Sequence, residues 1–274
     1  MGFAVNQRRR SWPAAPVWAI GVAAGLLCGS PARAQSGAPT VQSETAASAK
    51  ALTDRGAEAY DAGNDSAALV VFRRAAAIGD VDAMMYLGVM YGTGRGVDVD
   101  YAAAMTWFRQ AADGGNSQAM CNIGLLYFEG LGSPKSYREA LSWFRKAATS
   151  GNTEAMFNIG VQFRDGLGVS VNYAEAMRWF RRAAGEGDYT SANAVGVLYQ
   201  QGLGVSVDYA ESMRWYLKAA EAGYDTAMYN IGVLWEGGLG TTQNRDQAIT
   251  WYRKASAIGN ERAKAALKSL GVKD

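Results

Sequence analysis

The chain has 274 residues, of which 49% are hydrophobic and 19% charged, with 33 glycines, 2 cysteines and no histidine. The absence of histidine excludes catalytic triads that use imidazole, zinc sites with histidine ligands and histidine proton shuttles. The formal charge is +2, but residues 1–34 hold four arginines and no acid, so 23 basic and 25 acidic residues remain and no nucleic-acid-binding surface is expected.

Residues 1–34 have the three parts of a secretory signal peptide. A basic stretch at 8–10 precedes an apolar run at 17–28, and Ala-Arg-Ala at 32–34 has the small-x-small pattern of a cleavage site. The apolar run is shorter than the roughly 20 residues that cross a bilayer, so a permanent transmembrane helix is the weaker alternative. We therefore expect cleavage before Gln35, contact with the membrane only during export, and a periplasmic or secreted protein.

Residues 35–49 are small, polar and without periodicity, which predicts a flexible linker. Only Cys121 remains after cleavage, so an internal disulfide is excluded. Because the chain has no histidine to activate it, Cys121 is expected to be a small apolar core residue rather than a nucleophile.

From residue 80 the sequence repeats with a period of 36 residues, which indicates an array of stacked units. Tryptophan recurs at this interval, and glycine recurs in two phases. The tryptophans are Trp107, Trp143, Trp179, Trp215 and Trp251; one glycine series is Gly88, Gly124, Gly160, Gly196 and Gly232, and the other includes Gly115, Gly151, Gly187, Gly223 and Gly259.

Each unit is predicted to contain two helices. In the first, Met156, Ile159, Gly160 and Phe163 and their equivalents have helical spacing and form one buried face. Glycine is costly inside a helix, so its recurrence predicts that a neighbouring helix approaches closely there.

The second helix is predicted to begin after a polar N-cap residue that recurs in every unit. Four of these caps have the spacing of a capping box, as in Ser136 with Glu139. Glycines such as Gly151 are expected to end this helix in the left-handed conformation, and Asn152 to start the next first helix. The predicted caps are Asn64, Asp100, Ser136, Asn172, Asp208 and Asn244.

These residues together follow the pattern A-M-x-N-I-G-x-x-Y-x-x-G-x-G-V-x-x-x-Y-x-x-A-x-x-W-F-R-x-A-A-x-x-G, which resembles the Sel1-like repeat of the tetratricopeptide superfamily. The resemblance covers about residues 80–270, with departures at Tyr86 and Ala194, where other units have asparagine. It implies an all-α, right-handed α-solenoid of stacked antiparallel helix pairs. The expected order is a tetratricopeptide-like unit at 50–79, five Sel1-like repeats at 80–259, and a capping helix and tail at 260–274.

Several motifs have both a functional and a structural interpretation. The glycines of 92–96 could cradle a phosphate, but they recur in every loop between the paired helices, which favours a turn. The tryptophans could bind sugars, but their recurrence favours packing between repeats. Paired bases such as Arg181 and Arg182 are expected to form a solvated face. No cluster of carboxylates interrupts the repeat, so we expect no enzyme activity, no metal and no cofactor.

Resemblance to tetratricopeptide grooves places the binding surface on the first helices, at fixed offsets from the recurring glycine. An apolar groove there implies a protein or peptide partner, with Phe128 and Phe157 as anchors outside the repeating core. Val and Leu at the middle offset have the alternative of packing between repeats. The expected partner-binding residues are Met85, Cys121, Leu125, Phe128, Phe157, Val161, Arg164, Asn193, Gln200, Tyr229 and Glu236.

We therefore expect an exported, non-enzymatic scaffold or adaptor that is a monomer. The resemblance implies the adaptor role, since some exported relatives modulate envelope sensors or exopolysaccharide production. The alternative is binding of a cell-wall component or small ligand, related to peptidoglycan or β-lactams. The cysteine-rich relatives linked with that role have disulfide-paired helices, which Cys121 alone cannot form.

Overall fold

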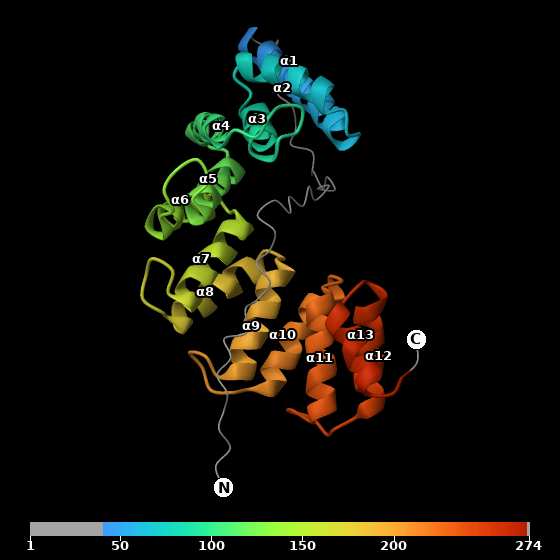
Figure 1. Cartoon of the computed structure of the whole chain (residues 1–274). Helices are drawn as coiled ribbons and strands as arrows, with labels where there is room; N and C mark the ends of the chain where they lie inside the picture. Colours follow the sequence, from blue (N-terminus) through green and yellow to red (C-terminus); the bar gives the residue numbers. More distant parts are fainter. Residues whose placement is uncertain (1–40, 273–274) are drawn as a thin grey trace, which may run out of the picture. The chain divides into compact units, whose positions relative to one another are not determined.

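A computed structural model describes residues 41–272, which form helices and no strand and divide at Asp100 into two compact units. The prediction of an all-α fold built from stacked helix pairs is confirmed (Figure 1). The N-terminal unit contains α1 (Val41–Asp61), α2 (Asp65–Ala77) and α3 (Val81–Thr93). The second unit contains α4 (Tyr101–Asp113), α5 (Ser117–Glu129), α6 (Tyr137–Thr149), α7 (Thr153–Asp165), α8 (Tyr173–Gly185), α9 (Tyr189–Gln201), α10 (Tyr209–Glu221), α11 (Asp225–Gly237), α12 (Arg245–Ala257) and α13 (Glu261–Ser269).

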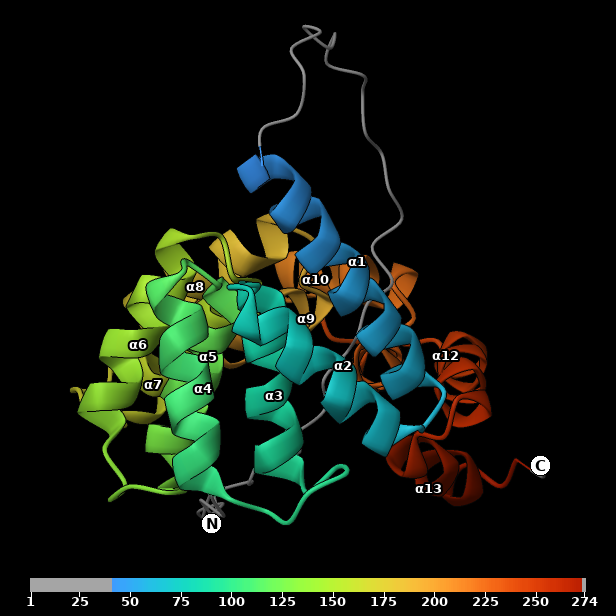
Figure 2. The same cartoon turned by 90° about the horizontal axis from the view of Figure 1, so that it is seen from above.

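In the N-terminal unit α1 lies along α2 (Figure 2). The ring of Phe72 fills the space beside Gly56, where a Cβ atom would lie 2.6 Å from Phe72 Cε1, and Tyr86 of α3 stacks on Phe72 at 4.6 Å. The predicted linker extends too far, because α1 already begins at Val41. The stretch at 41–49 contains no glycine or proline, and burial of Ala49 extends the helix toward its N-terminus. The predicted signal peptide lies outside the described residues.

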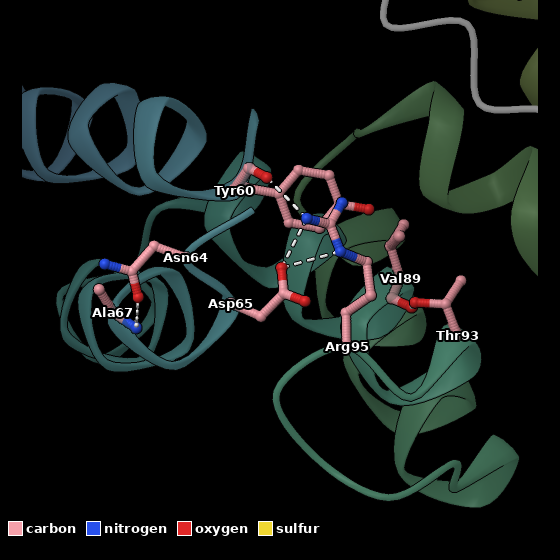
Figure 3. A network of polar contacts seen from close by, with 7 residues as sticks. All are labelled: Tyr60, Asn64, Asp65, Ala67, Val89, Thr93 and Arg95. Carbon is pink, nitrogen blue, oxygen red and sulfur yellow. Dashed lines mark hydrogen bonds and ion pairs between the residues drawn. The ribbon is translucent and has the colours of Figure 1, made fainter. Parts of the chain in front are cut away.

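Arg95 ties the loop after α3 to the turn between α1 and α2 (Figure 3). Its guanidinium donates to the carboxylate of Asp65 at 2.8 Å through Nε and to the backbone carbonyl of Tyr60 at 2.6 Å, and it lies 3.4 Å from the centre of the Tyr60 ring. The hydrogen bond that Arg95 donates to Asp65 raises the pKa of Arg95. One side chain thus satisfies the carbonyl at the end of α1 and the acid at the start of α2.

The helix ends of the second unit follow the predicted capping chemistry. Ser136, Asn172, Asp208 and Asn244 each accept a hydrogen bond from the backbone amide three residues later, at 2.9–3.2 Å. The glycines after the second helices have positive φ, as at Gly151 (84°). A second set of positive-φ glycines, including Gly130 and Gly166, ends the first helices, so the glycine-rich loops are turns.

The second half of the capping-box prediction, in which the side chain three residues later accepts from the backbone amide of the cap residue, was wrong. The backbone amide of each cap residue donates to a carbonyl near the end of the first helix of its own pair, as from Ser136 to Tyr127 at 2.8 Å. The Glu175 carboxylate is turned instead toward Arg178, at 2.6 Å. The loop folds back onto the first helix, and this backbone acceptor replaces the glutamate that the sequence pattern offers.

The recurring glycine inside each first helix makes room for an aromatic ring of its paired second helix. A Cβ atom at Gly124 or Gly160 would lie 2.5 Å from Cε1 of Phe144 or Phe180. Tyr216 and Tyr252 fill the same space beside Gly196 and Gly232. The close neighbour is therefore a side-chain ring, which corrects our expectation of helix-to-helix approach without an intervening side chain.

The array ends at α13, which buries Ala263 and Leu267 against α12. Lys268, at the position of the recurring glycine, is exposed. Arg245 of α12 donates to the carbonyl of Leu270 at 2.5 Å, which satisfies a backbone acceptor at the end of α13.

Candidate functional site

The predicted site residues lie on the first helices, on both sides of the interior glycine. We call the accessible sides of α5, α7, α9 and α11 in the second unit the first-helix face. Met85 is half-buried on α3 of the N-terminal unit. The other predicted residues all belong to α5, α7, α9 and α11.

Four apolar residues on α5 and α7 are half-buried and partly accessible. Leu125 and Phe128 of α5 pack against a core cluster that includes Phe144 and Ile159. Phe157 and Val161 of α7 pack against the next cluster, which includes Phe180. The core lies beneath these side chains, and their remaining surface forms an apolar part of the first-helix face.

Phe157 is part of the packing between repeats, contrary to our expectation that it lies outside the core. Its ring centre is 5.5 Å from that of Phe180, and it contacts the cluster that includes Ala194. Phe128 also has an aromatic neighbour, because Tyr137 lies edge-on at 5.0 Å and the Lys135 ammonium lies 5.9 Å from the Phe128 ring centre. Neighbouring side chains therefore hold the rings of both Phe128 and Phe157 in a defined orientation.

Cys121 and Asn193 are fully buried, so their assignment as partner contacts was wrong. Burial raises the pKa of the Cys121 thiol well above its usual value, with the hydrogen bond to Asn158 opposing this shift. The Asn193 amide oxygen accepts a hydrogen bond from Asn230 Nδ2 at 3.0 Å. Both positions lie under the asparagine of the next repeat, which covers them.

Three predicted polar residues hold internal partners. The Arg164 guanidinium donates to both carboxylate oxygens of Asp165, at 2.7 and 2.6 Å. The Gln200 side-chain oxygen accepts from the hydroxyl of Tyr216 at 2.6 Å, and the Glu236 carboxylate accepts from Tyr252 at 2.6 Å.

Burial, followed by the bond to Glu236, raises the pKa of Tyr252. The ring centre of Tyr229 lies 5.6 Å from that of Tyr252. The predicted residues of α9 and α11 thus mostly support the fold.

The N-terminal halves of successive first helices are joined by polar side chains. Gln118 donates to the Glu154 carboxylate at 2.9 Å and accepts from Asn152 at 3.0 Å. The departure from the repeat at Ala194 has a steric reason. The residue 37 positions earlier is the large Phe157, whereas the equivalent positions hold the smaller Cys121 and Asn193, and Phe157 packs in the same cluster as Ala194. At the other departure, Tyr86 provides a ring for stacking on Phe72.

The bases of the second helices link neighbouring repeats rather than forming only a solvated face. Arg109 and Arg181 donate to the hydroxyls of Tyr127 and Tyr199 on the following first helix. Lys218 donates to the carbonyl of Ala184 at 2.7 Å, at the end of the preceding second helix. Sequence reasoning missed these contacts, although the recurring 18- and 34-residue separations are present in the sequence.

The tryptophans are half-buried and pack between repeats, with a base beside each of four rings. Trp179 of α8 contacts the cluster formed mainly by α5, α6 and α7, and Trp215 of α10 contacts the cluster of α8 and α9. The ammonium groups of Lys146 and Lys254 lie 4.0 Å from the centres of the Trp143 and Trp251 rings. This arrangement supports packing rather than a sugar platform.

The two kinds of helix have opposite charge in the second unit. The first helices α5, α7, α9 and α11 contain five acids and one base, Arg164. The second helices α6, α8, α10 and α12 contain eleven bases and five acids. The first helices of this unit are therefore net acidic and the second helices net basic.

Two further classes of site were sought in the part of the chain that the structure describes. Residues 41–272 contain no group of three or more His, Cys, Asp or Glu side chains placed to hold a metal ion. None of the helices in this range combines the length and apolar character needed to cross a membrane.

The Sel1 repeat family matches five segments of the chain: 81–116, 117–152, 153–188, 190–224 and 225–260. A Sel1 repeat protein from Oxalobacter formigenes has a similar structure, with a TM-score of 0.75, 33% identity, and coverage of 80% of this chain and 89% of that one. No curated protein matches the sequence.

Two further solved structures are similar. The protective antigen c5321 of uropathogenic Escherichia coli, which has an SLR fold, gives a TM-score of 0.71 at 34% identity, covering 81% of this chain and 49% of its own length. The present chain thus spans about half of that antigen. PilF of Pseudomonas aeruginosa shares the fold at 18% identity and a TM-score of 0.60, covering 82% of this chain and 99% of its own.

Proposed function

Since the chain belongs to the Sel1 repeat family, we propose that it is a non-enzymatic scaffold that binds a segment of a partner protein on the first-helix face of α5 and α7. Proteins of this family generally mediate protein–protein interactions, and their fold is typical of non-catalytic scaffolds. That general role does not specify a surface, so the choice of α5 and α7 rests on the side chains of these two helices.

The observation that carries the proposal is the partly accessible apolar group of Leu125, Phe128, Phe157 and Val161 on two successive first helices. On α9 and α11 the corresponding positions include the buried Val197 and the hydrogen-bonded Gln200 and Glu236. Aromatic and aliphatic side chains that are held in place but not fully covered are typical of the central contacts in protein interfaces. We therefore place the partner over α5 and α7.

A pair of valines in one repeat allows a matched test. Val161 is half-buried on the first-helix face, whereas Val171 is 52% exposed in the loop between α7 and α8. Val161→Lys places a charge within the proposed apolar contact, and Val171→Lys places the same charge outside it. Immobilised wild-type and variant proteins would be used to capture partners from an envelope extract.

We expect Val161→Lys to lose at least about 90% of the specifically captured partner, a change of roughly 1.4 kcal/mol or more. Val171→Lys should capture the wild-type amount. Normal capture by a folded Val161→Lys protein would refute the proposed surface. If that variant unfolds below the assay temperature, Leu125→Gln provides the same test at a second half-buried position.

We also propose that the protein is exported and functions in the periplasm or outside the cell. The support is the basic stretch at 8–10, the apolar run at 17–28 and the Ala-Arg-Ala sequence at 32–34. Intact mass spectrometry of the protein from its native cells should give a chain that begins at Gln35. A full-length product retained in the membrane would contradict this proposal.

A further inference from the structure

Helix α11 begins in a different way from the other first helices. Its cap residue is Tyr224, and no side chain provides a cap hydrogen bond. The same position elsewhere always holds a residue that accepts the capping bond, so tyrosine breaks a strong local preference here. The equivalent residues with cap bonds are Asp80, Asn116, Asn152, Asp188 and Asn260.

Tyr224 pairs with a second unusual tyrosine at the start of α9. The ring centre of Tyr189 lies 5.3 Å from that of Tyr224 at an interplanar angle of 43°, and Tyr189 is 45% exposed. The position of Tyr189 is occupied by Ser117 and Thr153 in α5 and α7. Two departures from the repeat in neighbouring units thus produce one exposed aromatic pair.

Two carboxylates are fixed beside these rings. Asp188 accepts from the backbone amide of Ser191 at 2.5 Å, and Asp225 accepts from Thr226 N at 2.7 Å and from Asn260 Nδ2 at 2.8 Å. Each acid adjoins one of the tyrosines in the chain, because Asp188 precedes Tyr189 and Asp225 follows Tyr224. Burial first, and then the charges of Asp225 and Asp188, raise the pKa of Tyr224, while a hydrogen bond with Thr226 opposes this shift.

The other charged groups near these helix ends leave an acidic surplus. Two helix N-termini contribute roughly +0.5 charge each, whereas the two carboxylates contribute −2, so the local balance is about −1. Of the bases on the last turns of α8 and α10, Arg182 donates to Ala148 O, in the segment before α7. Lys218 donates to Ala184 O, four residues before Asp188, and therefore adds one positive charge near the start of α9. The exposed Glu186, which follows α8, and Glu221, the last residue of α10, add two negative charges, so the balance stays acidic.

We propose that Tyr189 and Tyr224, with Asp188 and Asp225, bind a lysine or arginine side chain of the partner. Aromatic faces attract a cation through the ring quadrupole, and carboxylates beside the rings add direct charge attraction. An uncharged proline would use the rings but would gain nothing from the two acids. A sugar would donate hydrogen bonds from its hydroxyls to the carboxylates, but it has no positive charge for the two acids to attract. This inference rests on the proposed function only in that the partner carries the cation, and it concerns a different place on the molecule from α5 and α7.

The test uses free compounds, so it does not depend on knowing the partner. The full chain with 13C-labelled tyrosine rings would be titrated with N-acetyl-arginine methylamide, and with the citrulline analogue, which has nearly the same shape but no charge. Tyrosine ring signals report binding by NMR. We expect a saturable shift of the Tyr189 and Tyr224 signals with the arginine compound, and at most a shift several-fold smaller with citrulline.

Residues from other repeats supply conservative variants. Tyr189→Thr and Tyr224→Asn introduce the residues found at 153 and 152, and both should abolish the arginine-dependent shift of the remaining ring. Asp188→Asn keeps a residue able to cap α9 and should weaken binding about threefold to fivefold. Asp208→Asn, the same change at the cap of α10, is the control and should leave the titration unchanged.

Equal shifts with the arginine and citrulline compounds, or no shift with either, would overturn the cation site. So would an arginine-dependent shift that Asp188→Asn and Asp208→Asn reduce equally. The partner-capture experiment at Val161 is independent of this titration. Failure of the cation site with normal Val161-dependent capture would therefore reject this inference and leave the proposed function standing.

Discussion

The pairs α5–α8 and α9–α12 have the same backbone plan but use the space around the interior glycine differently. In α5–α8 the ring beside the glycine is phenylalanine, Phe144 or Phe180, and it needs no polar partner. In α9–α12 the ring is tyrosine, and its hydroxyl donates to Gln200 or Glu236 on the first helix. The residue four places after the glycine thus changes together with the ring.

This difference separates positions that support the fold from positions in the proposed contact surface. In α9 and α11 the side chains at this position satisfy a buried hydroxyl, so they are committed to the fold. In α5 the same position holds Phe128, which keeps accessible apolar surface. The backbone is the same in both regions. Two side chains in each repeat make the difference: Phe144 with Phe128 in one, and Tyr216 with Gln200 in the other.

The largest expected effect is at the glycine that both regions share. Gly160→Val places a branched side chain where even a Cβ atom would lie 2.5 Å from Phe180, so we expect the free energy of unfolding to fall by about 3 kcal/mol. Gly185→Ala is the control, because Gly185 ends α8 with no atom within 4 Å of a Cβ, and it should raise stability by roughly 0.5 kcal/mol. Chemical denaturation measures both free energies of unfolding. Equal changes would contradict the claim that an aromatic ring fills the space beside the interior glycine.

The next effect comes from exchanging the chemistry of the two regions. Phe144→Tyr adds a hydroxyl near Phe128, where no Gln or Glu accepts it, and should cost about 1–3 kcal/mol. The double variant with Phe128→Gln restores the pairing found at 216 and 200. A double-mutant cycle should then give a favourable coupling of about 1 kcal/mol. If the two changes in the free energy of unfolding simply add, the residues at 128 and 144 do not interact and the change of both between repeats is incidental.

A smaller effect is expected from removing one hydroxyl in the second region. Tyr252→Phe should cost about 1 kcal/mol near neutral pH, because the bond to Glu236 is lost. The folded state raises the pKa of Tyr252 above its ordinary value of 10.0. The contribution of Tyr252 to the free energy of unfolding is therefore fully present below pH 10 and decreases above it, because the hydroxyl then ionises in the unfolded state first. The wild type should therefore lose stability more steeply above pH 10 than the Phe variant. Parallel pH profiles would contradict the raised pKa.

The period and the caps could be predicted from sequence because they depend on residues within one helix. Asn172 caps a helix whose amide lies three residues away, and Gly151 adopts positive φ where the chain must turn. Such local chemistry repeats in every unit and is therefore easy to recognise. The start of α1 was missed because residues 41–49 are small and polar like a linker, yet they contain no glycine or proline and include the buried Ala49.

The candidate site was harder to predict because its residues are decided by neighbours in other repeats. Cys121 and Asn193 have the offset of a groove residue, yet the asparagines 37 positions later cover them. Phe157 faces Ala194 instead and keeps part of its surface accessible. A pattern within one repeat contains no information on these pairs, whereas comparison of residues 37 positions apart would have revealed them.

The account's central claim is that a partner segment lies over α5 and α7 rather than over the basic second helices. Photo-crosslinking tests it most directly, with benzoylphenylalanine at Glu129, next to Phe128 on α5, or at Arg178, which is exposed on α8. We predict that the protein labelled at 129 crosslinks to the captured partner and that the protein labelled at 178 does not. Crosslinking from 178 with none from 129, in proteins that both remain folded, would contradict the claim.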